Sequence, residues 1–168
     1  MAHLLIVRHG EPTLHGVFLG TLDPVLSDKG RMQAQALAAS IGEGLAVYAS
    51  PLPRAAETAA FLGQPVTSIE EFREISYGPW EGLRWAEIEE RFPQEARRKI
   101  DDWFGYTVEG AETWPHFRAR VQSGLRRVQP SSVVVAHLGV NSVLRELITG
   151  QPAMNFIQDY CEIVELTL

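Results

Sequence analysis

The run Ser132 to Ala136, which reads Ser-Val-Val-Val-Ala, is the feature that most restricts how this 168-residue chain can fold. Its apolar residues follow one another without polar alternation, which is typical of a strand buried on both faces. Ala2 to Val7 has the same character and ends at Arg8-His9-Gly10. Two buried strands far apart in the sequence indicate a sheet whose strands are joined by long connections.

Helical and strand-like segments alternate along the rest of the chain. The expected helices cover residues 27–41, 52–62, 113–128 and 139–148, and further short strands are expected over 45–49, 65–69 and 161–168. In the first helix, Ser27 is the expected N-cap, and Met32, Ala36, Leu37 and Ile41 have the spacing of one apolar face. The alternation predicts an α/β fold, a three-layer α/β/α sandwich with a largely parallel central sheet.

Residues 70–114 differ in character from the segments on either side. Three of the four tryptophans lie between residues 70 and 108, together with several charged residues and the helix breakers Gly78-Pro79, Gly82, Pro93 and Gly105. We interpret 70–114 as a covering insertion of short helices over the C-terminal strand ends. The whole chain, 1–168, is then expected to form one domain.

Composition restricts the partners and the location. The formal net charge of −6 argues against nucleic acid as a partner. No apolar run approaches the roughly 20 residues of a membrane helix, so no membrane association and a cytoplasmic location are expected. Cys161 is the only cysteine, and no Cys/His cluster has zinc spacing, so neither a metal nor another cofactor is expected. The sequence leaves the oligomeric state open.

Three expected strand ends bring basic residues to one edge of the sheet. His9 and His137 each follow a buried strand, and Ser50 to Arg54 places Arg54 in the first turn of the next helix. Ligands of open α/β sheets bind outside the carboxyl ends of the strands. Two histidines, the guanidinium groups of Arg8 and Arg54, and helix N-termini suit an anion. The residues therefore predict a pocket for a dianion such as a phosphate ester.

Six short stretches in one order resemble a known family, the histidine phosphatase superfamily of phosphoglycerate mutase-like proteins. The compact phosphatase branch, similar to α-ribazole phosphatases and broad-specificity phosphatases, is the nearest in size. The stretches are Arg8-His9-Gly10-Glu11, Leu26-Ser27-Asp28-Lys29-Gly30 with Gln33-Ala34, Ser50-Pro51-Leu52-Pro53-Arg54-Ala55-Ala56-Glu57-Thr58, Arg73-Glu74-Ile75-Ser76-Tyr77-Gly78-Pro79-Trp80-Glu81-Gly82, Glu109-Gly110-Ala111-Glu112-Thr113 and Ala136-His137-Leu138-Gly139-Val140.

The resemblance implies a role for each catalytic position. His9 is the implied nucleophile, which holds the phosphoryl group as phosphohistidine. Arg8, Arg54 and His137 are the implied clamp on the phosphoryl oxygens. Glu74 is the implied general acid, and no metal is required.

The resemblance is weaker at the positions that would contact the substrate, because the chain departs from the family pattern in two places. The loop 12–20 is shorter than usual, with Val17 where an arginine is common, and Leu138 follows the second histidine where glycine is usual. His15 is an open case, either lining the pocket or lying in an exposed loop. The substrate-binding residues that the resemblance implies are Arg8, His15, Gly20, Thr21, Arg54, His137 and Leu138.

The function expected from these residues is hydrolysis of a small phosphorylated metabolite. Two alternatives stay open at this point: a phosphoglycerate mutase, and a non-catalytic module that binds phosphorylated ligands. Glu81 is the alternative to Glu74 as general acid. His3 and His116 are not expected to be functional, and the tryptophans are expected mainly to pack in the core or the cover. The sequence does not identify the physiological substrate.

Overall fold

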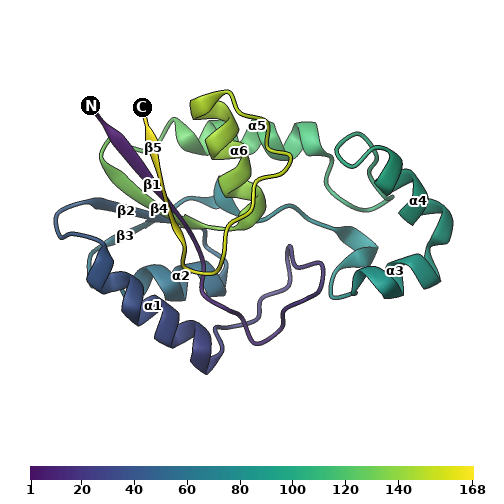
Figure 1. Cartoon of the computed structure of the whole chain (residues 1–168), viewed down its shortest axis with the longest axis horizontal. Coiled ribbons are helices and arrows are strands. Elements are labelled where there is room, and N and C mark those ends of the chain that lie inside the picture. Colours follow the sequence, from purple (N-terminus) through teal and green to yellow (C-terminus); the bar gives the residue numbers. More distant parts are fainter.

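A five-stranded sheet forms the centre of the computed structural model, which describes all residues from 1 to 168 (Figure 1). Its order is β3-β2-β4-β1-β5. The first four strands in this order run parallel, and β5 pairs with β1 in the antiparallel direction. The strands are β1 (His3–Arg8), β2 (Ala46–Ala49), β3 (Val66–Ser68), β4 (Ser132–Ala136) and β5 (Ile163–Thr167). The predicted largely parallel sheet is confirmed.

Helices cover both faces of the sheet. Successive side chains of a strand point to opposite faces, so Ile6 and Val134 join one apolar cluster and Val7 and Val133 join another. The first cluster lies against α5 (Trp114–Leu125) and α6 (Leu138–Thr149), and the second against α1 (Asp28–Ser40) and α2 (Pro53–Ala60). The three-layer α/β/α architecture predicted from the sequence is therefore confirmed.

The first helix begins where expected but buries a different face. Ser27 is the N-cap, and its side chain accepts a hydrogen bond from the Gly30 N–H at 3.0 Å. Met32, however, is 71% exposed, whereas Ala34 and Leu37 are buried. The reason is close contact at Gly30, where a Cβ atom would collide with the Glu11 backbone. This contact turns the Gly30 side of the helix inward, so the predicted apolar face was only partly correct.

Short helices cover one end of the molecule beyond the strand ends. They are the 3₁₀ helix η2 (Gly78–Trp80), α3 (Trp85–Arg91) and α4 (Pro93–Asp101) (Figure 1). The 3₁₀ helix η1 (Glu70–Phe72) packs instead against α5, and its Phe72 belongs to the first apolar cluster. Trp80, Ile88, Ala96 and Val108 form a small core of their own within this cover. Phe18, from the loop after β1, packs its ring against the aromatic rings of the cover.

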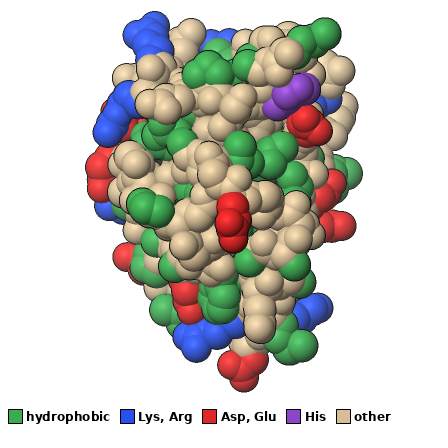
Figure 2. Space-filling view, turned by 90° about the vertical axis from the view of Figure 1, so that its left-hand side faces the viewer, with side chains coloured by type: hydrophobic (Ala, Val, Ile, Leu, Met, Phe, Trp, Pro, Cys, Tyr) green, Lys and Arg blue, Asp and Glu red, His purple; other side chains and the backbone are tan.

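Acidic and basic side chains are mixed on the face that lies at the β2–β3 side of the sheet. Figure 2 shows them scattered among hydrophobic and uncharged groups, without a contiguous patch of either sign. None of the helices is both long enough and apolar enough to span a membrane.

Candidate active site

Two histidines meet at the ends of two neighbouring strands. β1 and β4 pair in parallel with Arg8 opposite Ala136, so the next residue of each strand is a histidine. The His9 N–H donates to the Ala136 carbonyl at 3.0 Å, and the two imidazole centroids lie 5.2 Å apart. Both side chains are buried. The two rings are close enough for one phosphate group to contact both.

His9 is held in one orientation by its own neighbour. Its Nδ1 lies 2.7 Å from the Gly10 carbonyl oxygen, which can only accept, so Nδ1 carries the proton and Nε2 keeps its lone pair. Burial, reinforced by the charges of Arg54 and Arg8, lowers the pKa of His9 to about 3. The ring is therefore neutral at neutral pH, as a nucleophile must be.

The tautomer of His137 is set by a hydroxyl group. Ser50 Oγ lies 2.7 Å from His137 Nε2 and accepts the Leu52 N–H at 3.2 Å. A hydroxyl that accepts from Leu52 can donate its proton to Nε2, which leaves the imidazole proton on Nδ1. Nδ1 is buried and has no hydrogen-bond partner within the protein. Burial, followed by the Arg54 charge, holds the pKa of His137 well below its usual value.

The two guanidinium groups are fixed by backbone carbonyls. Arg8 Nη1 donates to the Gln158 carbonyl at 2.8 Å, and the Tyr160 ring lies 4.2 Å from the guanidinium carbon. Arg54 is fully buried and donates to the carbonyls of Leu22 (2.8 Å) and Gly20 (3.0 Å). The Nε atoms of both arginines are buried without a partner. No carboxylate forms an ion pair with either, so their charge is available to an anion.

Glu74 lies in irregular chain between η1 and η2, with its carboxyl group buried. Its Oε1 accepts the Ile75 N–H and its Oε2 accepts the Gly139 N–H, both at 3.0 Å. Burial raises the pKa of Glu74 above its usual value, although these two hydrogen bonds and the charge of Arg54 oppose the shift. A raised pKa favours the protonated carboxyl group, which is the form that can donate a proton.

A pocket of about 410 Å³ brings most of the predicted residues together. Arg54 and His137 are buried next to it rather than exposed on its wall. His15 lines the pocket although it lies in an exposed loop, so both of its expected placements apply. The lining residues are Arg8, His9, His15, Gly16, Val17, Phe18, Leu19, Glu74, Tyr77, Trp85, Leu138 and Tyr160.

Gly20 and Thr21 lie outside this lining and contact Glu81 instead. The two N–H groups donate to Glu81 at 2.9 and 3.0 Å, and the Tyr77 N–H donates to the same carboxylate at 3.0 Å. Glu81 thereby connects the loop after β1 to the cover. Because Glu74 lines the pocket and Glu81 does not, the geometry favours Glu74 over Glu81 as the acid.

Sequence reasoning missed three residues of this site. Tyr160 lies over Arg8 with its ring centroid 5.7 Å from that of His9, Gln158 accepts from Arg8, and Ser50 orients His137. Ser50 is the first residue of the stretch from Ser50 to Thr58 that resembles the family. Its place at a strand end, four residues before Arg54, could have indicated that it lies in the site. Tyr160 and Gln158 lie in irregular chain with no periodic pattern. No group of three or more His, Cys, Asp or Glu side chains in the chain is arranged to hold a metal ion.

Comparisons with known proteins agree with this geometry. The model of the histidine phosphatase superfamily (branch 1) matches residues 4–168. Phosphoserine phosphatase 1 of Hydrogenobacter thermophilus is 33% identical over 150 residues, which cover 82% of this chain and 71% of that protein.

Two solved structures are similar over nearly the whole chain. A mycobacterial glucosyl-3-phosphoglycerate phosphatase with VO3 superposes with a TM-score of 0.84 and 28% identity, covering 99% of this chain and 93% of that one. The α-ribazole phosphatase of Shigella flexneri has a TM-score of 0.82 and 24% identity, with 98% and 95% of the two chains covered. At that identity the second match bears on the fold alone.

Proposed function

The chain belongs to the histidine phosphatase superfamily, and from this premise we propose that it hydrolyses small phosphomonoesters through a phosphohistidine on His9. That it is a phosphatase follows from the family and from its phosphatase relatives. The observation that supports the covalent route is the state of His9. Its buried ring is neutral, with the proton held on Nδ1 by Gly10 and the Nε2 lone pair free.

In the first step, the Nε2 lone pair of His9 attacks phosphorus and the bond from phosphorus to the ester oxygen breaks. The leaving oxygen takes the proton of the Glu74 carboxyl group and departs as an alcohol. The products of the step are phosphohistidine, an alcohol and the Glu74 carboxylate. The Gly10 carbonyl, 2.7 Å from Nδ1, stabilises the positive charge that the ring gains on phosphorylation.

In the second step, a water molecule attacks the phosphohistidine. The Glu74 carboxylate takes one proton from the water, the oxygen bonds to phosphorus, and the N–P electron pair returns to Nε2. Inorganic phosphate leaves, and both His9 and protonated Glu74 are restored. One carboxyl group thus serves as acid and then as base, and its raised pKa suits both tasks.

The charge that develops on the phosphoryl oxygens needs fixed donors in a dry site. Arg8, Arg54 and the Nδ1–H of His137 supply them, and their unpartnered buried nitrogen atoms support this role. Backbone carbonyls hold both guanidinium groups before substrate arrives, so little reorganisation is needed.

The walls of the pocket support a substrate with one phosphate and an uncharged, partly apolar leaving group. Val17, Phe18, Tyr77 and Trp85 line the space beyond the catalytic residues. Arg8 is the only lysine or arginine in the lining. A mutase that works through a bisphosphate needs cations for a second phosphate, so the lining favours hydrolysis over mutase activity.

The decisive experiment is to trap the intermediate and to separate the two catalytic roles. In rapid-quench reactions, wild-type protein should form an acid-labile phosphoenzyme, and His9→Ala should form none. Glu74→Gln should slow phosphorylation by an alkyl phosphate by about 10²–10⁴-fold, the usual contribution of general acid catalysis. With p-nitrophenyl phosphate, whose leaving group departs without protonation, the slowing should be much smaller.

His3→Ala is the matched control, because His3 lies on the same strand and pairs only with Glu165 at the surface. It should retain full activity, and activity should persist in EDTA. A phosphoenzyme that still forms in His9→Ala would overturn the proposed nucleophile. Equal slowing of both esters in Glu74→Gln would overturn the proposed acid.

A further inference from the structure

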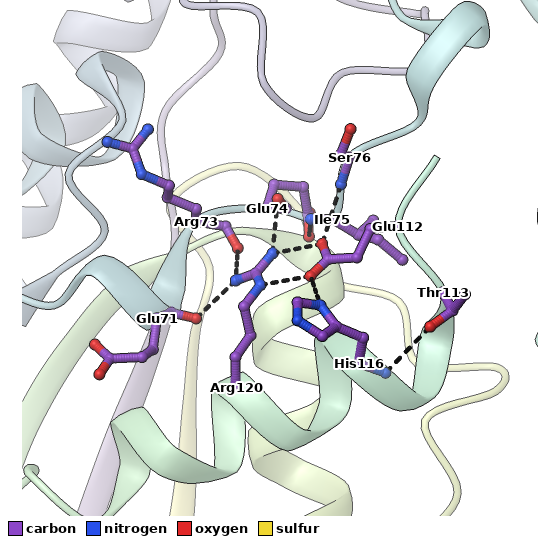
Figure 3. Close-up of polar contacts among 9 residues, drawn as sticks. All are labelled: Glu71, Arg73, Glu74, Ile75, Ser76, Glu112, Thr113, His116 and Arg120. Atoms are coloured by element: carbon purple, nitrogen blue, oxygen red, sulfur yellow. Dashed lines mark hydrogen bonds and ion pairs between the residues drawn. The ribbon is translucent and has the colours of Figure 1, made fainter. Parts of the chain in front are cut away.

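The segment that contains Glu74 has no regular structure of its own. Residues 73–77 belong to no helix or strand, and they connect η1 to η2. A general acid must stay within hydrogen-bond reach of the ester oxygen, and such a connection cannot fix its own backbone. Figure 3 shows that Arg120, from the middle of α5, and Glu112, which lies just before that helix, contact this segment instead.

Arg120 of α5 uses its entire guanidinium group to bind backbone carbonyls within residues 71–74 and the carboxylate of Glu112. Nη1 donates to the carbonyls of Glu71 (2.8 Å) and Arg73 (2.7 Å), and Nη2 donates to the carbonyl of Glu74 (3.1 Å). Nε and Nη2 also donate to the two carboxylate oxygens of Glu112, at 2.7 and 2.8 Å. These are five hydrogen bonds, and a guanidinium group has five N–H donors.

Glu112 holds the other end of the same segment. Its Oε2 accepts the Ser76 N–H at 3.3 Å, and its own N–H donates to the Ser76 carbonyl at 2.9 Å. Arg120 therefore fixes carbonyls up to and including that of Glu74, while Glu112 fixes the residue two positions beyond it. The Arg120–Glu112 pair encloses the general acid from both sides along the chain (Figure 3).

The pair is itself firmly held. The Phe117 ring, fully buried, lies 4.7 Å below the Arg120 guanidinium, and the two charged side chains are only 21% and 12% exposed. Burial alone would raise the pKa of Glu112, but hydrogen bonds from Arg120 and from His116, whose Nδ1 lies at 2.7 Å, lower it below its usual value. The carboxylate stays charged, so the bidentate pair persists.

We propose that Arg120 is a positioning residue for the general acid, and that with Glu112 it fixes the backbone from which Glu74 reaches the leaving oxygen. The inference rests on the acid role of Glu74 proposed above. Arg120 does not line the pocket and touches no reacting atom. Arg120 acts on the backbone of residues 71–76, which carries Glu74. It should therefore influence protonation of the leaving oxygen and not the binding of phosphate.

Arg120→Lys tests the proposal, because a lysine has three donors on one atom and cannot replace the planar fork. The displaced acid should slow single-turnover phosphorylation by an alkyl phosphate by about 10–10²-fold, since a shift of about 1 Å can cost about 10²-fold. Phosphorylation by p-nitrophenyl phosphate should slow far less. The inhibition constant of inorganic phosphate should not change, because Arg8, Arg54 and His137 are untouched.

Two further variants complete the design. Arg118→Gln is the matched control, because Arg118 lies on the same helix and pairs with Glu146 of α6 at 2.7 Å; both esters should react at the wild-type rate. Glu112→Gln keeps the shape of Glu112 but weakens the pair, and should give a smaller loss with the same preference for the alkyl ester. It also serves as the test should Arg120→Lys fail to fold.

A third comparison separates this inference from the proposed function. In the Glu74→Gln background, Arg120→Lys should add no further loss with the alkyl ester, because the acid that it positions is already absent. Equal slowing of the two esters by Arg120→Lys, or no slowing, would overturn the positioning role if Glu74→Gln still discriminates between them. If Glu74→Gln does not discriminate, the acid assignment itself is wrong.

Discussion

The backbone N–H of Gly139 donates to Oε2 of Glu74 at 3.0 Å, which connects the proposed acid to the first turn of the helix that follows His137. The contact leaves no room for a side chain, because a Cβ atom on Gly139 would collide with the Glu74 carboxyl oxygens. The chain has Leu138 where the family usually has a first glycine, but it keeps glycine at the position that faces the acid. The requirement for glycine at 139 is therefore steric.

Gly139→Ala should displace the Glu74 carboxyl group and reduce kcat. We expect a loss of about 10–10²-fold with an alkyl phosphate, the size of effect that a small misplacement produces, and a smaller loss with p-nitrophenyl phosphate. Steady-state kinetics on both esters measures the difference. Leu138→Ala, one residue earlier, removes a pocket wall without touching Glu74 and should act on KM instead. Wild-type kcat in Gly139→Ala would contradict the steric argument.

Ser50→Ala should disturb the tautomer of His137. Without the hydroxyl at 2.7 Å, Nε2 loses its donor and the imidazole proton is no longer confined to Nδ1. A hydrogen bond of this kind is worth about 1 kcal/mol, so the phosphorylation rate should fall by about 5–10-fold with every ester, irrespective of the leaving group. Single-turnover kinetics gives the rate. A loss restricted to alkyl esters would show that Ser50 acts on the acid and not on the phosphate.

Glu81→Ala should weaken phosphate binding more than protonation. The variant frees the N–H groups of Gly20, Thr21 and Tyr77, and the Gly20 carbonyl is one of the groups that fix Arg54. The backbone of Glu74 and Ser76 stays held by Arg120 and Glu112. We expect KM and the inhibition constant of inorganic phosphate to rise together by about 10-fold, the effect of losing a charge-assisted hydrogen bond. The ratio of alkyl to p-nitrophenyl rates should stay as in wild type. A strong change in that ratio would restore Glu81 as a candidate acid.

The buried histidines should make the fold sensitive to acid. The pKa of His9 falls from 6.5 to about 3 on folding, mainly through burial, so between these values the unfolded chain binds more protons than the folded one. Stability from His9 is thus fully present above about pH 6.5 and is lost as the pH falls toward 3. The lowered pKa of His137 acts in the same direction.

Urea unfolding at several pH values measures this effect. The difference in unfolding free energy between wild type and His9→Ala should grow in favour of the wild type from pH 3 to pH 6.5 and stay constant above it. The raised pKa of Glu74 acts in the opposite sense, so its stabilisation is lost as the pH rises through that pKa. A parallel series on Glu74→Gln separates the two. A pH-independent difference for His9→Ala would show that the ring is not buried neutral.

The predictable parts of the molecule are those determined by local pattern. Ser132 to Ala136 has the bounds expected from its apolar run, and the histidines at the ends of β1 and β4 meet because parallel neighbours end at one edge. The first helix shows the limit. Its N-cap was predictable from Ser27, but its buried face depends on the approach of Gly30 to Glu11, which periodicity does not encode.

The unpredictable parts depend on contacts between segments distant in sequence. The stretch from Glu109 to Thr113 was recognised as part of the family resemblance without a role for Glu112. That role emerges only when α5 lies against residues 71–76, which no local pattern specifies. Tyr160 and Gln158 likewise contact Arg8 across 150 residues of sequence or more.

The strand that ends at the nucleophile has its neighbours far away in the chain. β1 pairs with β4 on one side and with β5 on the other, and the Cys161 N–H donates to the Arg8 carbonyl at 2.9 Å. During synthesis on the ribosome, β1 emerges long before β4 and β5. The backbone N–H and C=O groups of β1 therefore have no partner strand until these later strands have been made. A nascent chain that ends before residue 158 lacks both β5 and the Gln158 carbonyl that holds Arg8. Hydrolytic activity should therefore appear late in synthesis and report that β1 has paired with both β4 and β5.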